Sequence, residues 1–137
     1  MESNIFSLFA VPFVHVRHPE EAALNQALRA HILSAEAQGN RYRNPSPAMA
    51  IPDRLFESTF EFFASREPCV QQLKAFCFFW LKKTIGDLSN MNAAELDALT
   101  VHSHTWFHVS RSGAYFSMHN HPMASWSGVY CVSPGDG

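Results

Sequence analysis

Hydrophobic positions in the first part of the chain follow helical spacing. Between Pro19 and Gly39-Asn40 they recur at intervals of three and four, and Pro19 followed by two glutamates is typical of a helix start. The spacing predicts a helix here, whose buried face is made of Ala23, Leu24, Ala27, Leu28, His31, Ile32 and Ala35. His31 lies on this face, and a histidine in such a position is more often a residue at the edge of the core than a metal ligand.

Two more helices are expected on the same spacing, over about residues 53–65 and 68–86. The first of them turns a set of apolar and small residues inward: Leu55, Phe56, Thr59, Phe60 and Phe63. The second is apolar on several sides, which is typical of a helix that is buried on several sides or that awaits a partner surface. Asn92 and Glu95 form a weak capping box for a short helix that ends near Leu99.

The segments around these helices have different patterns. Residues 5–16 are short and rich in Phe and Val, which indicates a strand. Residues 40–53 contain three prolines and no periodicity, so we expect a loop.

From residue 100 the pattern changes to the alternation of a strand. Over positions 101–109, Val101, Ser103, Thr105, Phe107 and Val109 share one face, and His102, His104, Trp106 and His108 share the other. A turn at Arg111-Ser112-Gly113 separates this strand from two more, expected over 114–121 and 126–133. The histidine face is more typical of a half-exposed sheet face than of a metal site. His108 is its member nearest to the turn.

Composition places these elements in one domain over residues 1–137. The chain is 47% hydrophobic with a net charge of −2, and its ten Lys and Arg are scattered, so we expect a packed core and no nucleic-acid partner. Three cysteines, Cys69, Cys77 and Cys131, have no metal-type spacing and indicate reduced thiols. The apolar run over 5–16 is too short for a membrane span and lacks the basic start of a signal peptide. These features predict a soluble, cytoplasmic protein without a membrane partner.

The strongest chemical motif is the histidine pair His119 and His121. Two residues separated by one position on a strand point the same way, with Cβ atoms about 6–7 Å apart. Neutral imidazoles so placed can bind one divalent ion at about 2.0–2.1 Å. Pro122 ends the strand and places the pair near the rim of the sheet. The sequence has no nucleophile elbow and no glycine-rich phosphate loop.

Three stretches around this pair resemble a known family. They read W-F-H-V-S-R-S-G-A-Y over 106–115, H-N-H-P over 119–122 and S-G-V-Y over 127–130. They are similar to the 2-oxoglutarate/Fe(II)-dependent oxygenases whose core reads W-x-N-x-x-x-x-G-x-Y, H-x-H-P and S-G-V-Y-Y-V. The segment S-L-F-A-V-P-F-V-H-V and the following L-N-Q-A-L also resemble the opening of that family.

The resemblance implies an α+β fold in which N-terminal helices pack on the first strands of a double-stranded β-helix, or jelly roll. It implies Fe(II) and 2-oxoglutarate as cofactors and a hydroxylase-type reaction on a small molecule or an amino-acid side chain. His119 takes the place of the first iron ligand, and His121 stands where the wider superfamily has a carboxylate. Tyr115 and Cys131 fall at positions expected to bind the cosubstrate, although Cys131 replaces a tyrosine of the family pattern.

The same resemblance predicts an incomplete domain. The family continues into further strands that supply a distal histidine and an arginine for the cosubstrate. Residues 1–100 would then be a mostly helical support and 101–137 the first core strands with the metal motif. Their exposed edges are compatible with a homo-oligomer.

Two alternatives stay open. Gly113 followed by the H-x-H pair matches the opening of a cupin signature, but residues 122–128 lack the glutamate that a cupin needs. The other alternative is a non-catalytic remnant or helical interaction module with an incidental histidine pair.

Overall fold

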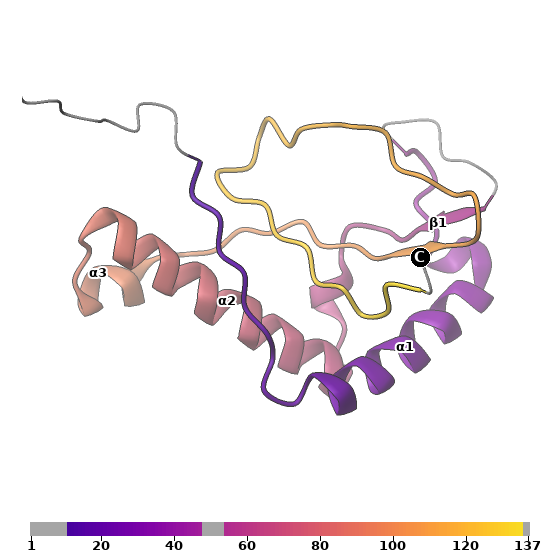
Figure 1. The fold of residues 1–137 in the computed structure, drawn as a ribbon, viewed down its shortest axis with the longest axis horizontal. Coiled ribbons are helices and arrows are strands. Elements are labelled where there is room, and N and C mark those ends of the chain that lie inside the picture. The colour runs from indigo at the N-terminus through magenta and orange to yellow at the C-terminus, as the bar shows by residue number, and fades with distance from the viewer. Residues whose placement is uncertain (1–10, 48–53, 136–137) are drawn as a thin grey trace, which may run out of the picture.

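A computed structural model of the chain describes residues 11–47 and 54–135. Within these ranges the chain has mixed α and β structure, with three α-helices and one two-stranded antiparallel sheet. The elements in chain order are α1 (Glu21–Ala37), η1 (Gly39–Arg41), β1 (Leu55–Glu57), η2 (Phe62–Ala64), α2 (Pro68–Ser89), α3 (Ala93–Ala98) and β2 (His108–Ser110). Helices α1 and α2 diverge from a common corner, and β1 lies near the C-terminal end of α1 (Figure 1).

Helix α1 confirms the helical pattern of the first segment. Its buried residues are Leu24, Leu28, Ile32 and Ala35, one stripe of the predicted face, whereas Ala23 and Ala27 of that face are exposed. His31 is half-buried beside Phe62, with ring centroids 6.1 Å apart, which is the core-edge position expected for it. The chain leaves the helix through Gly39, whose φ of +58° lies in the left-handed region that favours glycine.

The helix predicted over 53–65 is wrong for its described residues. Leu55–Glu57 form β1, which pairs antiparallel with β2, and only Phe62–Ala64 form a short 3₁₀ turn. Residues 55–58 are all buried, so the apolar spacing reflects a strand enclosed on both faces and not one helical stripe. Pairing with a strand more than fifty residues away decides the conformation here, and this overrides the local pattern.

Helices α2 and α3 have nearly the predicted bounds. The burial of α2 on several sides is not observed, since only Val70 and Leu73 are buried and Phe79 is 61% exposed. Helix α2 runs three residues past Gly86 and ends at Asn90, whose φ is +53°. Gly86 lies inside the helix, and its missing side chain leaves room for α3: a Cβ at this position would lie 2.8 Å from Cδ1 of Leu96. The capping box of α3 is formed, with the N–H of Glu95 donating to Oδ1 of Asn92 at 3.1 Å and the N–H of Asn92 donating to the Glu95 carboxylate at 2.8 Å.

The alternation predicted over 101–109 is present, but only its last part pairs as a strand. Phe107 is buried and Val109 half-buried, while His102 and His104 are exposed on the other face. Strand β2 begins at His108, and Thr105 makes an isolated bridge to Glu61.

The strands expected over 114–121 and 126–133 are not formed, since both segments lack helix and strand. The turn at Arg111–Ala114 leads this part of the chain away from β2 in a wide arc (Figure 1). Residues 11–16 of the first predicted strand form no strand either, and residues 5–10 lie outside the described ranges.

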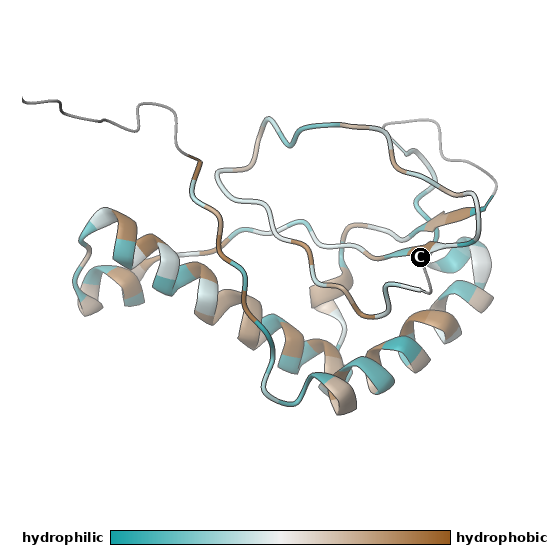
Figure 2. Cartoon of the chain, viewed as in Figure 1, coloured by the Kyte–Doolittle hydropathy of each residue, from teal (hydrophilic) through white to brown (hydrophobic). Residues whose placement is uncertain are grey.

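One hydrophobic core joins the helices to the sheet. Leu24, Leu28, Ile32, Ala35, Phe56, Val70, Leu73 and Phe107 form it, and most of β1 and patches along α2 are hydrophobic in Figure 2. Phe56 and Phe107 stack across the sheet at 5.8 Å. The observed fold class is therefore α+β, and the jelly roll remains a prediction.

Candidate metal centre

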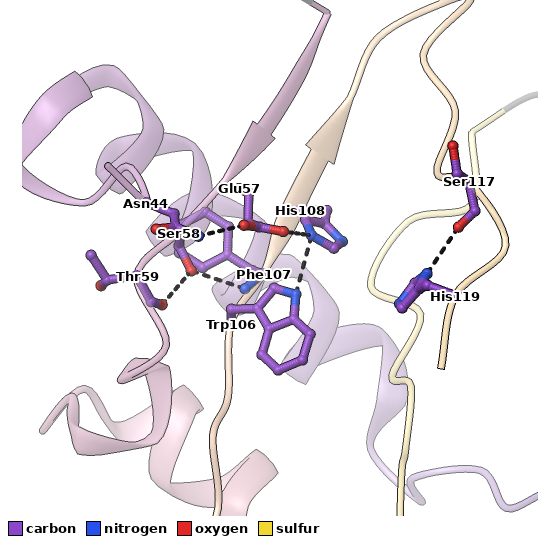
Figure 3. A network of polar contacts seen from close by, with 9 residues as sticks. All are labelled: Asn44, Glu57, Ser58, Thr59, Trp106, Phe107, His108, Ser117 and His119. Carbon is purple, nitrogen blue, oxygen red and sulfur yellow. Dashed lines mark hydrogen bonds and ion pairs between the residues drawn. The ribbon is translucent and has the colours of Figure 1, made fainter. Parts of the chain in front are cut away.

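Five aromatic side chains make a closed series of ring contacts beside the sheet. They are Trp106, His108, Phe116, His119 and His121, and consecutive ring centroids lie 4.3 to 6.3 Å apart around the circuit. Trp106 and His108 come from β2 and the residues just before it. The other three come from the segment after the turn at residues 111–114. Figure 3 shows the β2 side of this cluster and His119 across from it. We call these five residues the histidine cluster.

The two histidines of the motif lie together in this cluster. The ring centroids of His119 and His121 are 4.9 Å apart, and their planes are nearly perpendicular at 82°. Two imidazoles that bind one ion at 2.0–2.1 Å have centroids roughly 4.5–5.2 Å apart for angles of about 90–110° at the metal. The spacing of the two rings therefore fits a shared divalent ion such as Fe(II).

A hydrogen bond fixes the proton of one of these rings. Nδ1 of His119 lies 2.9 Å from the carbonyl oxygen of Ser117 (Figure 3). A carbonyl only accepts, so Nδ1 carries the proton and donates it. The Nε2 lone pair of His119 is then left for a metal, which is the common arrangement in which a backbone carbonyl orients a ligating histidine.

His108 is held by a buried carboxylate from β1. Glu57 and His108 are directly opposite in the sheet, and Oε2 of Glu57 lies 3.0 Å from Nε2 of His108. The Glu57 side chain is only 8% exposed, and the amide of Asn44 donates to its Oε1 at 2.7 Å. Each oxygen of this carboxylate therefore has a donor beside it (Figure 3).

Nε2 of His108 also lies 3.1 Å from the indole nitrogen of Trp106. One ring nitrogen cannot donate to a carboxylate and accept from an indole N–H at the same time. Donation to the Glu57 carboxylate is charge-assisted and is the stronger of the two interactions. We therefore place the proton on Nε2, and the indole N–H of the half-exposed Trp106 is left to solvent.

The other two predicted site residues are not members of the histidine cluster. Tyr115 is 69% exposed, and Cys131 is exposed beside Tyr130, which packs against α1 and α2. Their assignment to the cosubstrate stays a prediction. Within residues 11–47 and 54–135, no group of three or more His, Cys, Asp or Glu is arranged to hold a metal ion.

Tyr130 ties the last described segment to the helices. Its hydroxyl donates to Oδ1 of Asn25 at 2.7 Å, and its ring meets Phe76 edge-on. Burial raises the pKa of Tyr130 above its usual 10.0, and Glu21, Cys77 and Cys131 raise it further. Burial likewise raises the pKa of the Cys77 thiol above 9.0, which keeps it protonated and unreactive.

Glu57 and Asn44 were not identified from the sequence. Glu57 fell inside a segment expected to be helical, and Asn44 inside a proline-rich loop. If Leu55–Glu57 had been predicted as a strand, one acidic residue would have been placed opposite the histidine face of residues 101–109, and this pairing could have indicated Glu57.

Comparisons with models of protein families, with curated proteins and with solved structures find no match. In the described part of the chain, no helix combines the length and the apolar character required to cross a membrane.

Proposed function

We propose that this chain is part of a non-haem Fe(II)/2-oxoglutarate-dependent oxygenase of the hydroxylase type. His119 and His121 are two of its iron ligands. The observation that supports this most directly is the spacing of the two rings, 4.9 Å between centroids and nearly perpendicular. The resemblance of three motifs around the pair supports the choice of iron and 2-oxoglutarate.

The neighbouring residues suit a metal site of this kind. Ser117 orients His119 through its carbonyl, which leaves Nε2 free to ligate. Phe116 contacts the ring of His119 at 5.3 Å, and Trp106 contacts the ring of His121 at 5.6 Å. A ferrous ion held by few protein ligands keeps coordination positions open to small molecules, and that is the chemistry it supplies here.

Metal titration tests the proposal. Co(II) reports on its coordination by its visible absorption, so we would titrate it into the wild-type chain and into the double variant His119→Ala/His121→Ala. The matched control is His102→Ala/His104→Ala, which removes two exposed histidines outside the cluster. We expect the control to bind Co(II) as the wild type does and the double variant to lose binding by at least tenfold.

The cosubstrate is tested in the same samples. We expect 2-oxoglutarate to bind the Co(II)-loaded wild type more tightly than the metal-free chain, as measured by calorimetry. Equal weak Co(II) binding by all three proteins would refute the metal site. Tight Co(II) binding without any effect on 2-oxoglutarate would refute the oxygenase and favour a cupin-like metalloprotein.

A further inference from the structure

We propose that His108 is a hydrogen-bond acceptor for the substrate and that Glu57 is the residue that positions it. In this assignment Nδ1 of His108 accepts a hydrogen bond from an uncharged O–H or N–H group, and the apolar part of the same molecule packs on Trp106 and Phe116. The inference rests on the proposed function only in taking this ligand to be the substrate of that site. The binding itself requires no metal.

The Glu57 carboxylate determines which nitrogen of His108 is free. Its Oε2 lies 3.0 Å from Nε2 of His108, and the proton between them belongs to the nitrogen, because an ionised carboxylate only accepts. In the neutral ring the lone pair is then on Nδ1. No group within residues 11–47 and 54–135 donates a hydrogen bond to that atom. His108 therefore offers one unused acceptor of known position in the ring.

The carboxylate is itself held in place, so the orientation of His108 is built into the fold. The Glu57 side chain is 8% exposed, and the amide of Asn44 donates to its Oε1 at 2.7 Å. Antiparallel pairing of β1 with β2 places residues 57 and 108 opposite each other. An acceptor that is oriented before the ligand arrives lowers the entropic cost of binding, which is what a binding residue requires.

The ring of His108 is supported on its face and stays accessible. The centroid of the Phe116 ring lies 4.3 Å from that of His108 at a tilt of 34°, a distance that requires contact with the face of the imidazole. The lone pair of an imidazole nitrogen lies in the ring plane, so this contact leaves Nδ1 unobstructed. The His108 side chain is 29% exposed, and Trp106 and Phe116 beside it are half-buried. A ligand can therefore approach from solvent and meet both aromatic rings.

This acceptor is close to the proposed iron ligands. Phe116 contacts the rings of both His108 and His119, at 4.3 and 5.3 Å, so a single ring separates the acceptor from the first ligand. Trp106 bridges His108 and His121 in the same way. A substrate hydrogen-bonded to His108 and packed on these two rings is thereby placed beside the metal site.

The charges around the site favour an uncharged ligand. Residues 112–135 contain no Asp, Glu, Lys or Arg. Arg111, just before them, is paired with Glu36 at 2.7 and 3.0 Å, and the Glu57 carboxylate already has a donor at each oxygen. A charged group on the ligand finds no unpaired partner of opposite sign in this segment, whereas an apolar group finds aromatic surface. The ligand class is therefore a neutral alcohol, phenol or amide on an apolar body.

Phenol is the probe for this site, because it joins one neutral O–H donor to an apolar ring. Anisole is the matched probe without the donor. We would titrate both into the metal-free wild-type chain at about pH 8, where an ordinary imidazole is neutral, and record nitrogen-15 NMR spectra of the histidine side chains. We expect His108 to be protonated on Nε2, its Nδ1 resonance to move with phenol only, and phenol to bind about 3–10-fold more tightly than anisole. A protonated Nδ1 in the free chain, or equal responses to the two probes, would overturn the proposal.

Glu57→Gln separates a positioning role from a merely structural one. Because Asn44 donates to one side of the group, the amide oxygen of the substituted side chain faces Asn44 and its NH2 faces Nε2 of His108. The proton of His108 then moves to Nδ1, so we expect the preference for phenol over anisole to disappear while far-UV circular dichroism is unchanged. Glu61→Gln, an exposed glutamate in the same segment, is the control and is expected to keep the preference.

Two further outcomes of these titrations are decisive. An undiminished preference for phenol in Glu57→Gln would overturn the positioning role. Co(II) titration of the same samples distinguishes this inference from the proposed function. If Co(II) binds the histidine pair and phenol shows no preference over anisole, the inference fails alone. If phenol binds as expected and Co(II) does not bind, the proposed function fails and the acceptor site stands.

Discussion

Glu57→Ala gives the most direct measure of how strongly the buried polar network holds the sheet. The substitution removes a side chain that is only 8% exposed and that lies within hydrogen-bond distance of Asn44 and His108. The backbone of residue 57 stays paired, because its carbonyl accepts from the N–H of Asn44 whatever the side chain is. The change therefore isolates the side-chain interactions.

The expected loss of stability follows from these two contacts. A hydrogen bond to a charged group contributes about 1.5–3 kcal/mol. Asn44 is half-buried and the His108 side chain is 29% exposed, so both partners regain part of their hydrogen bonding from water. We expect the free energy of unfolding to fall by about 2–4 kcal/mol. At about 3–4 °C per kcal/mol for a chain of this length, the Tm falls by roughly 6–16 °C.

Urea unfolding followed by circular dichroism and by tryptophan fluorescence measures this loss. Glu57→Gln keeps one acceptor for Asn44 and is expected to lose less, about 1–2 kcal/mol. The control is Glu61→Ala, which changes an exposed glutamate in the same segment and is expected to stay within about 0.5 kcal/mol of the wild type. If Glu57→Ala unfolds at the same midpoint as this control, the network does not stabilise the sheet and our reasoning is wrong.

Two further predictions concern the helices. Gly86→Ala places a Cβ 2.8 Å from Leu96, so we expect faster hydrogen exchange throughout α3. The control Gly128→Ala, with nothing within 4 Å of the added Cβ, is expected to leave hydrogen exchange unchanged. Equal exchange in α3 for the two variants would contradict the close packing of Gly86 against Leu96. Tyr130→Phe removes the hydrogen bond to Asn25 and is expected to cost about 0.5–1.5 kcal/mol at pH 8. Because burial raises the pKa of Tyr130 above 10.0, its contribution is complete well below pH 10 and is lost as the pH rises through the folded-state pKa, so the difference between the urea midpoints of wild type and variant should shrink above pH 10. A constant difference across that range would show that the folded state does not favour the protonated hydroxyl.

The sequence predicted the parts of this structure that local signals determine. Helix α1 follows from apolar spacing, and α3 from a capping box whose two partners are three residues apart. The closeness of His119 and His121 to each other was likewise predictable, because one intervening residue limits how far apart two side chains can lie.

The parts that failed depend on distant partners. Residues 55–57 are a strand only because His108–Ser110 pair with them, and no local pattern records that pairing. Glu57 becomes significant only beside His108, 51 positions later in the chain. The strands expected over 114–121 and 126–133 also depend on distant partners, and no described strand pairs with either segment.

The segment that carries the histidine pair has both of its ends fastened to the same helix. Arg111 makes two hydrogen bonds to the carboxylate of Glu36, at 2.7 and 3.0 Å, and Tyr130 bonds to Asn25. Glu36 and Asn25 are eleven positions apart in α1, which is roughly 16 Å along the helix axis. Residues 112–129 therefore form a loop whose two ends are held at a fixed separation by α1. An insertion between residues 111 and 130 therefore carries only the small entropic cost of a longer loop.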